Sequence, residues 1–100
     1  PSNVDVVFSF ASLLHSNKDD VEKVLRKVHK TLRIGGIFYI SLKVADSYTQ
    51  EVKHDEYGQR RFYFYNPRII QDIMGDGYEV VYEDYQDLKS KWFTIALRKL

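Results

Sequence analysis

Hydrophobic residues in this chain fall into short runs that are separated by polar segments. The first run, Val4 to Phe10, is apolar at nearly every position, and Asp5 and Ser9 are its polar residues. Apolar residues on both faces predict an interior parallel strand that is buried on both sides. A second run, Ile37 to Leu42, is rich in β-branched and aromatic residues and predicts another strand of this kind.

The segment between these strands has the period of an amphipathic helix. Its apolar positions recur every three or four residues and are Val21, Val24, Leu25, Val28 and Leu32. After a loop from Ala11 to Ser16, either Ser16 or Asn17 is expected to cap the helix start. The pair Gly35-Gly36 is expected to cap its end, because glycine tolerates the left-handed conformation. Strand, helix and strand then form a βαβ unit with parallel strands and a right-handed crossover.

Lys43 to Tyr57 is polar and has no clean period, which predicts a loop with at most a helical turn. Gly58 to Tyr65 is expected to be extended. Asn66-Pro67 predicts the start of a second helix, because asparagine is a good N-cap and proline suits the first helical position. Gly75-Asp76-Gly77 is expected to end that helix.

Two further strands are expected near the end of the chain, at Tyr78 to Asp84 and at Trp92 to Lys99. The polar connection between them, Gln86 to Lys91, is too short for a crossover helix. These two strands should therefore be antiparallel.

The totals are those of an ordinary globular chain. One hundred residues, 44% of them hydrophobic and 29% charged, predict a single domain over residues 1–100. The formal net charge of +1 gives no general attraction to nucleic acid or to an anionic membrane. No apolar run is long enough to span a bilayer and no signal peptide is visible, so a cytoplasmic location is the default expectation.

Sequence motifs for catalysis or metal binding are not found. There is no cysteine, and the three histidines, His15, His29 and His54, are widely separated, which disfavours a metal site. His29 is expected to be a polar position on the first helix. No G-x-S-x-G elbow, P-loop or G-x-G-x-x-G turn is present. We therefore predict no catalytic nucleophile and no metal ligand.

Arg60-Arg61 followed by four aromatic residues allows two interpretations. A basic and aromatic strip can bind single-stranded nucleic acid. Alternating aromatic residues fit a half-buried strand or lid equally well. The near-neutral charge favours the strand, so no nucleic-acid partner is predicted.

Polar and small residues follow the first strand, where ligands bind in open α/β sheets. They are Ser9, Phe10, Ala11, Ser12 and His15. His15 is either a solvated loop residue, at the start of the helix, or a substrate contact, and the sequence leaves both open.

Taken in order, these segments resemble the second half of a class I S-adenosylmethionine-dependent methyltransferase. The segments that carry the resemblance are Val4–His15, Leu32–Ile40, Arg61–Pro67, Gly77–Val81 and Trp92–Lys99. Arg33 and Ile34 stand where the family usually has lysine and proline before its glycine pair. Each motif alone is loose, but the ordered set is fairly specific and covers nearly the whole chain.

The resemblance implies an α/β fold, half of a Rossmann-like methyltransferase fold. Its four-stranded mixed sheet would have the family order 4-5-7-6, two main helices and an antiparallel last strand. The family transfers a methyl group from S-adenosylmethionine, and we expect a small-molecule acceptor. The family's glycine-rich loop and acidic residue, which bind the cofactor, are not found in this sequence. We therefore expect a truncated chain that is inactive alone.

Site residues follow from the same resemblance. The cofactor-binding residues would be Ser9, Phe10 and Ala11. The substrate-binding residues would be Ser12, His15, Arg61, Tyr63 and Tyr65. Val4–Phe10 would be an unpaired apolar edge, so a homodimer is expected. The alternative is a non-catalytic remnant that acts as a dimerisation or binding module.

Overall fold

Two β-structures and two α-helices make up the part of the chain that the computed structural model describes, residues 4–10, 13–87 and 91–100. The elements in chain order are β1 (Val4–Phe10), α1 (Lys18–Thr31), β2 (Leu32–Lys43), β3 (Thr49–Asp55), β4 (Gly58–Phe64), α2 (Pro67–Met74), the 3₁₀ helix η1 (Gly75–Gly77), β5 (Tyr78–Asp87) and β6 (Lys91–Lys99).

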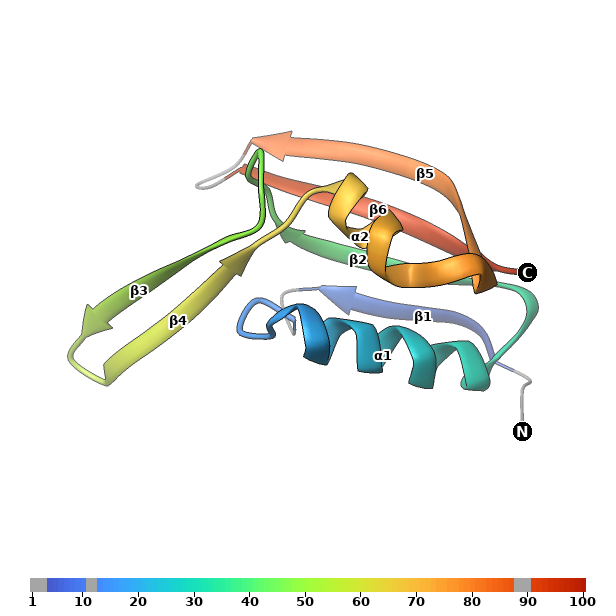
Figure 1. The fold of residues 1–100 in the computed structure, drawn as a ribbon, viewed down its shortest axis with the longest axis horizontal. Helices are drawn as coiled ribbons and strands as arrows, with labels where there is room; N and C mark the ends of the chain where they lie inside the picture. Colours follow the sequence, from blue (N-terminus) through green and yellow to red (C-terminus); the bar gives the residue numbers. More distant parts are fainter. Residues whose placement is uncertain (1–3, 11–12, 88–90) are drawn as a thin grey trace.

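The larger β-structure is a mixed sheet in the order β1-β2-β6-β5. β1 and β2 are parallel, whereas β6 is antiparallel to both of its neighbours. Numbered as in the methyltransferase family, this is the predicted order 4-5-7-6, and the predicted fold class is confirmed. Both helices lie on the same face of the sheet (Figure 1).

The core lies between that face and the two helices. Alternate residues of the two central strands are buried, among them Ile40 of β2 and Ile95 of β6. They pack in one cluster with Val21 and Leu25 of α1 and Ile70 of α2. Each such side chain contributes about 1.5–3 kcal/mol on burial, so this layer stabilises most of the fold.

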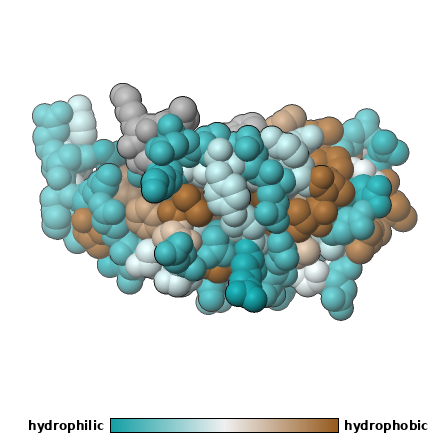
Figure 2. All heavy atoms as spheres, turned by 90° about the horizontal axis from the view of Figure 1, so that it is seen from above, coloured by the Kyte–Doolittle hydropathy of each residue, from teal (hydrophilic) through white to brown (hydrophobic). Residues whose placement is uncertain are grey.

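The opposite face of the sheet carries apolar residues that stay partly exposed. Phe8 of β1 is 60% exposed and Val6 is 41% exposed. The ring of Phe8 stacks on Tyr39 of β2, with centroids 5.1 Å apart and planes 10° from parallel. Hydrophobic patches also reach the surface on the side seen from above (Figure 2).

The end of α1 differs from the prediction. Asn17 caps its start as expected, because its side chain accepts a hydrogen bond from the Asp20 amide at 3.0 Å. The helix ends at Thr31, however, and not at the glycine pair. Leu32 has φ −70° and ψ 142°, is fully buried and pairs with Val4. Burial of Leu32 suits the helical pattern and the strand alike, which is why the pattern did not locate the boundary.

The glycine pair instead forms part of a bulge within β2. Val4 pairs with Leu32 and Val6 pairs with Ile37, so Asp5 lies opposite residues 33–36. The side chains of Asp5 and Arg33 form an ion pair across this step. Gly35 has φ +83°, and a Cβ at Gly36 would lie 2.9 Å from the Arg33 carbonyl oxygen. The two glycines therefore allow this bulge to fit closely between the parallel strands β1 and β2.

The polar segment Lys43–Tyr57 was predicted to be a loop, but part of it forms the strand β3. β3 pairs with β4 in an antiparallel hairpin that projects from the sheet (Figure 1). All seven residues of β3 are exposed, so they lack the alternation that marks a strand. β4 confirms most of the extended segment predicted for Gly58–Tyr65. The hairpin extends the molecule to 43 × 24 × 21 Å.

The second helix agrees with its predicted caps. The Asn66 side chain accepts a hydrogen bond from the Ile69 amide at 3.0 Å, and Pro67 is the first helical residue. β5 continues three residues beyond the predicted end at Asp84. The predicted antiparallel pairing of the last two strands is confirmed, and residues 88–90 of their connection lie outside the described residues.

Candidate functional site

The carboxyl ends of the parallel strands β1 and β2 lie at the same edge of the sheet, and β4 passes beside them. The turn after β1 is joined to β4 by two hydrogen bonds. The Tyr63 amide donates to the Leu14 carbonyl oxygen at 3.0 Å, and His15 Nδ1 donates to the Arg61 carbonyl oxygen at 2.7 Å. Segments more than forty residues apart thus form one surface at the edge where α/β proteins bind ligands.

The hydrogen bond of His15 determines where its proton lies. A carbonyl oxygen only accepts, so Nδ1 carries the hydrogen, and Nε2 of the neutral ring is left as an acceptor. The ring also packs against Phe62, with centroids 4.7 Å apart. His15 is an exposed residue of the turn after β1, and these two contacts hold its ring with one acceptor nitrogen remaining.

Tyr65 holds the base of the hairpin against the sheet. Its amide donates to the Lys43 carbonyl oxygen at 3.0 Å, and its carbonyl oxygen accepts from the Ala45 amide at 2.9 Å. Its hydroxyl donates to the Ser16 carbonyl oxygen at 2.5 Å. Burial, with the nearby hydroxyls of Tyr48 and Tyr63, raises the pKa of Tyr65 well above its usual range. Tyr65 is fully buried and remains a protonated donor.

Three tyrosines form an aromatic cluster at this base. Tyr48, which precedes β3, stacks on Tyr63 with centroids 6.0 Å apart and meets Tyr65 edge-on at 5.3 Å. The Lys18 ammonium lies 4.9 Å from the Tyr48 ring centroid. The cluster connects the start of α1 to both ends of the hairpin, so it fixes the hairpin relative to the body.

An open depression of about 560 Å³ lies between the turn after β1 and the hairpin. Its lining residues are His15, Val52, Gln59, Arg60, Arg61 and Tyr63. Its volume is within the range of small-molecule sites. Three of the five predicted substrate-binding residues, His15, Arg61 and Tyr63, line this one depression.

Two lysines lie against the ring of Phe62, which follows Arg61 in β4. The ammonium groups of Lys43 and Lys53 lie 4.7 and 5.4 Å from its centroid. Lys43 is only 9% exposed, although it is charged. The sequence analysis missed Lys43 and Tyr48, because their positions depend on contacts with residues far along the chain.

The remaining predicted residues are placed as follows. Ser9 is 8% exposed near the end of β1 and pairs with Ile40, and Phe10 ends the strand opposite Ser41. Ala11 and Ser12 lie outside the described residues. Tyr65 is fully buried and does not line the depression. The structure thus joins the substrate-side residues more closely than it joins the cofactor-side ones.

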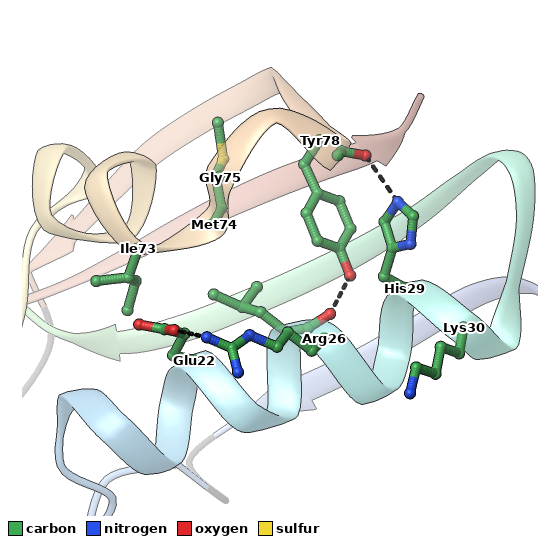
Figure 3. Close-up of a pocket in the computed structure, with 10 residues that line it drawn as sticks. Glu22, Arg26, His29, Lys30, Ile73, Met74, Gly75 and Tyr78 are labelled. Atoms are coloured by element: carbon green, nitrogen blue, oxygen red, sulfur yellow. Dashed lines mark hydrogen bonds and ion pairs between the residues drawn. The ribbon is translucent and has the colours of Figure 1, made fainter.

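A different groove, of about 400 Å³, lies between α1, α2 and the start of β5 (Figure 3). His29 Nε2 donates to the Gly77 carbonyl oxygen at 3.1 Å, and the Tyr78 hydroxyl donates to the Leu25 carbonyl oxygen at 2.6 Å. Burial raises the pKa of Tyr78 above its usual range. His29 is thus a half-buried link between α1 and β5.

In the part of the chain that the structure describes, no three His, Cys, Asp or Glu side chains cluster as metal ligands would. Neither α1 nor α2 has the length and apolar character of a membrane-spanning helix, within the same residues.

A family model and solved structures both match this chain to methyltransferases. Residues 1–40 match the family model described as a methyltransferase domain. A SAM-dependent methyltransferase from Methanosarcina mazei superposes with a TM-score of 0.86 at 13% identity, over 99% of this chain and 60% of its own. No curated protein matches the chain in the sequence search.

Two further structures hold S-adenosylhomocysteine. A 1,6-didemethyltoxoflavin N1-methyltransferase from Burkholderia thailandensis, which also holds 1,6-didemethyltoxoflavin, has a TM-score of 0.72 at 18% identity over 95% of this chain and 43% of its own. A glycopeptide N-methyltransferase has a TM-score of 0.74 at 12% identity over 96% of this chain and 54% of its own.

These matches confirm the resemblance to class I S-adenosylmethionine-dependent methyltransferases, and the fold of this chain is that of part of such an enzyme. The chain spans between 43% and 60% of the length of these three solved structures.

Proposed function

We propose that this chain is the C-terminal, substrate-side part of a methyltransferase that transfers a methyl group from S-adenosylmethionine to a small acceptor. The observation that carries the proposal is the depression in which His15, Arg61 and Tyr63 meet, beside the carboxyl ends of β1 and β2. The family model over residues 1–40 and the fold support it.

The residues at the end of β1 would form one wall of the cofactor site. Ser9 is buried there, and Phe10 follows it as the last residue of the strand. Ala11 continues this wall in the proposal. When bound, the cofactor supplies an electrophilic methyl group. The family's glycine-rich cofactor loop is not found in this sequence, so this wall alone would bind weakly.

On the acceptor side, the chain would position and desolvate rather than attack. Methyl transfer needs a nucleophilic acceptor atom held in line and shielded from water. His15 Nε2 can accept a hydrogen bond from the acceptor's hydroxyl or amino group, because Nδ1 is engaged by the Arg61 carbonyl. Arg61 and Tyr63 would contact the rest of the acceptor, and Ser12 remains a proposed substrate-binding residue by the family resemblance. Tyr65 would act from beneath by holding the turn at Ser16.

The proposal is tested by titrating the ¹⁵N-labelled chain with S-adenosylhomocysteine and following its amide signals. We expect weak, saturable shifts confined to residues 9–15, and no turnover when the chain alone is incubated with S-adenosylmethionine and a candidate acceptor. A matched titration with adenine controls for stacking of the base alone. Shifts that are absent, or equal with adenine, would contradict a surviving cofactor wall.

A second candidate function is supported by the open face of the sheet. Phe8, Val6 and β5 residues such as Val81 expose large apolar side chains. Apolar surface beside the edge strand β1 is typical of an association site. In this alternative the chain is a non-catalytic module that forms a homodimer. The oligomeric state of the chain in solution tests whether the homodimer forms.

A further inference from the structure

We propose that the depression beside His15 recognises an anionic oxygen group, a carboxylate or a phosphate, on the methyl acceptor, and that Arg61 is its principal contact. This inference deepens the proposed function and rests on it, because only that function makes the bound molecule a methyl acceptor.

The lining of the depression holds no carboxylate, and its charged donors are the guanidinium groups of Arg60 and Arg61, whereas His15 Nε2 is an acceptor. Of its six residues, Gln59, Arg60, Arg61, Tyr63 and His15 are polar and Val52 is apolar. Guanidinium groups present several N–H donors in a fork that matches a carboxylate or phosphate. Tyr63 and Val52 add an apolar wall, so the depression suits an oxyanion attached to a ring or short apolar body.

The two arginines differ in how their charges are compensated. Arg60 forms an ion pair with Asp55 on the same hairpin. Arg61 has no ion-pair partner within residues 4–10, 13–87 and 91–100. Its backbone is nevertheless held on both sides, because it pairs with Val52 of β3 and its carbonyl oxygen accepts from His15. An unpaired guanidinium on a fixed backbone is organised to bind an anion.

A second cation, without an ion-pair partner in the described part of the chain, lies near the depression but does not line it. Lys43 lies against Phe62, the neighbour of Arg61, and no carboxylate pairs with it among the described residues. Lys53, also against Phe62, lies 3.9 Å from Glu51. A charged side chain that is only 9% exposed and has no counter-ion is unusual. Residues 43–65 hold four Lys or Arg and four Asp or Glu, so the segment as a whole is neutral and the unpaired cations are individual groups.

Three small probes test the inference on the ¹⁵N-labelled 100-residue chain: benzoate, phenyl phosphate and neutral benzyl alcohol. We expect saturable shifts at the amides of Val52, Gln59, Arg61 and Tyr63 with at least one anion, and much smaller ones with benzyl alcohol. A stronger response to benzoate assigns a carboxylate, and a stronger response to phenyl phosphate assigns a phosphate.

Two matched variants separate contact from general charge. Arg61→Gln should raise the Kd of the preferred anion about tenfold, as loss of a charge-assisted hydrogen bond does. Lys53→Gln removes the same charge from the same hairpin and should change Kd less than about threefold, because Lys53 does not line the depression and lies beside Glu51. Both side chains are on an exposed hairpin, and an unchanged spectrum of the core amides checks the fold. Equal effects of the two variants, or equal binding of benzyl alcohol, would overturn the inference.

The outcome is independent of cofactor binding. Anion shifts without any response to S-adenosylhomocysteine would support the anion site and count against methyl transfer. A response to S-adenosylhomocysteine without anion shifts would overturn the anion site and leave the methyltransferase proposal standing.

Discussion

His29 and Gly77 are in direct contact, although 48 positions separate them in the chain. Nε2 of His29 donates to the Gly77 carbonyl oxygen at 3.1 Å, and the Leu100 amide donates to the same oxygen at 2.9 Å. The imidazole also meets the ring of Tyr78 edge-on, with centroids 5.2 Å apart. One carbonyl group thus connects the last turn of α1, the start of β5 and the end of the described chain.

The absence of a side chain at Gly77 is what permits this contact. A Cβ there would lie 2.7 Å from His29 Nε2, so Gly77→Ala should displace the ring and break the hydrogen bond. We expect a loss of about 1–2 kcal/mol in the free energy of unfolding, measured by urea denaturation. In a His29→Ala background the same change should cost clearly less, because the clash is gone. Additive costs in this double-mutant cycle would show that the two residues are not coupled.

The bulge between β1 and β2 predicts unequal tolerance at its two glycines. Gly36→Ala should destabilise the chain by about 1–3 kcal/mol, because its Cβ would press on the backbone oxygens of Arg33 and Asp5. Gly35→Asn is the matched control. Its Cβ would meet nothing within 4 Å, and asparagine tolerates a positive φ, so we expect a smaller cost. Thermal unfolding of both variants gives the comparison, and equal losses would contradict the packing explanation.

The turn of the hairpin should weaken in acid. The Arg60 guanidinium, and then the Tyr57 amide, hold the pKa of the Asp55 carboxyl below its ordinary value of 3.8. A carboxyl whose pKa is lower in the folded state stabilises that state above its unfolded pKa. The contribution is lost as the pH falls through the folded value.

We therefore expect amide protection at Tyr57 and Gly58 to be constant from about pH 7 to about pH 5 and to fall below about pH 4. Hydrogen exchange followed by NMR measures this. Asp55→Asn keeps an acceptor for the Tyr57 amide but cannot ionise, so its hairpin should lose the pH dependence. A wild-type hairpin that is insensitive to acid would show that the pair with Arg60 contributes nothing.

Self-association should depend on the open face of the sheet. If the homodimer forms, the double variant Val6→Thr, Phe8→Thr should be monomeric at chain concentrations where the wild type is dimeric, because it removes exposed apolar area from β1. Sedimentation velocity over a concentration series measures the mass. Ile34→Thr is the matched control, since Ile34 is 77% exposed but lies in the bulge. A wild type that stays monomeric at millimolar concentration would contradict the dimer.

The sequence was informative wherever local chemistry decides the structure. The caps at Asn17 and Asn66 satisfy amides three residues away, so a short window contains the whole signal. Leu32 shows where this fails, because burial was equally compatible with a helix and with a strand paired to Val4. β3 was missed because every residue in it is exposed, and pairing with β4 alone makes it a strand.

The candidate site was predictable only in part. The position of His15 after a parallel strand pointed to the ligand-binding edge. Its hydrogen bond to Arg61 spans 46 positions, and no sequence pattern connects two such residues. The same applies to Lys43, whose burial depends on Phe62 of a hairpin that the sequence did not fully reveal.

The exposed strand β3 has a consequence for how this protein can change. None of its side chains is buried, whereas the base of the hairpin is fastened by Tyr65 and the main chain around it. Substitutions, and even insertions near the Glu56-Tyr57 turn, should therefore leave the core intact, as exposed loop tips usually permit. If the hairpin binds a ligand as proposed, ligand preference and fold stability depend on separate stretches of the chain, and we expect that the hairpin can be redesigned without refolding the rest.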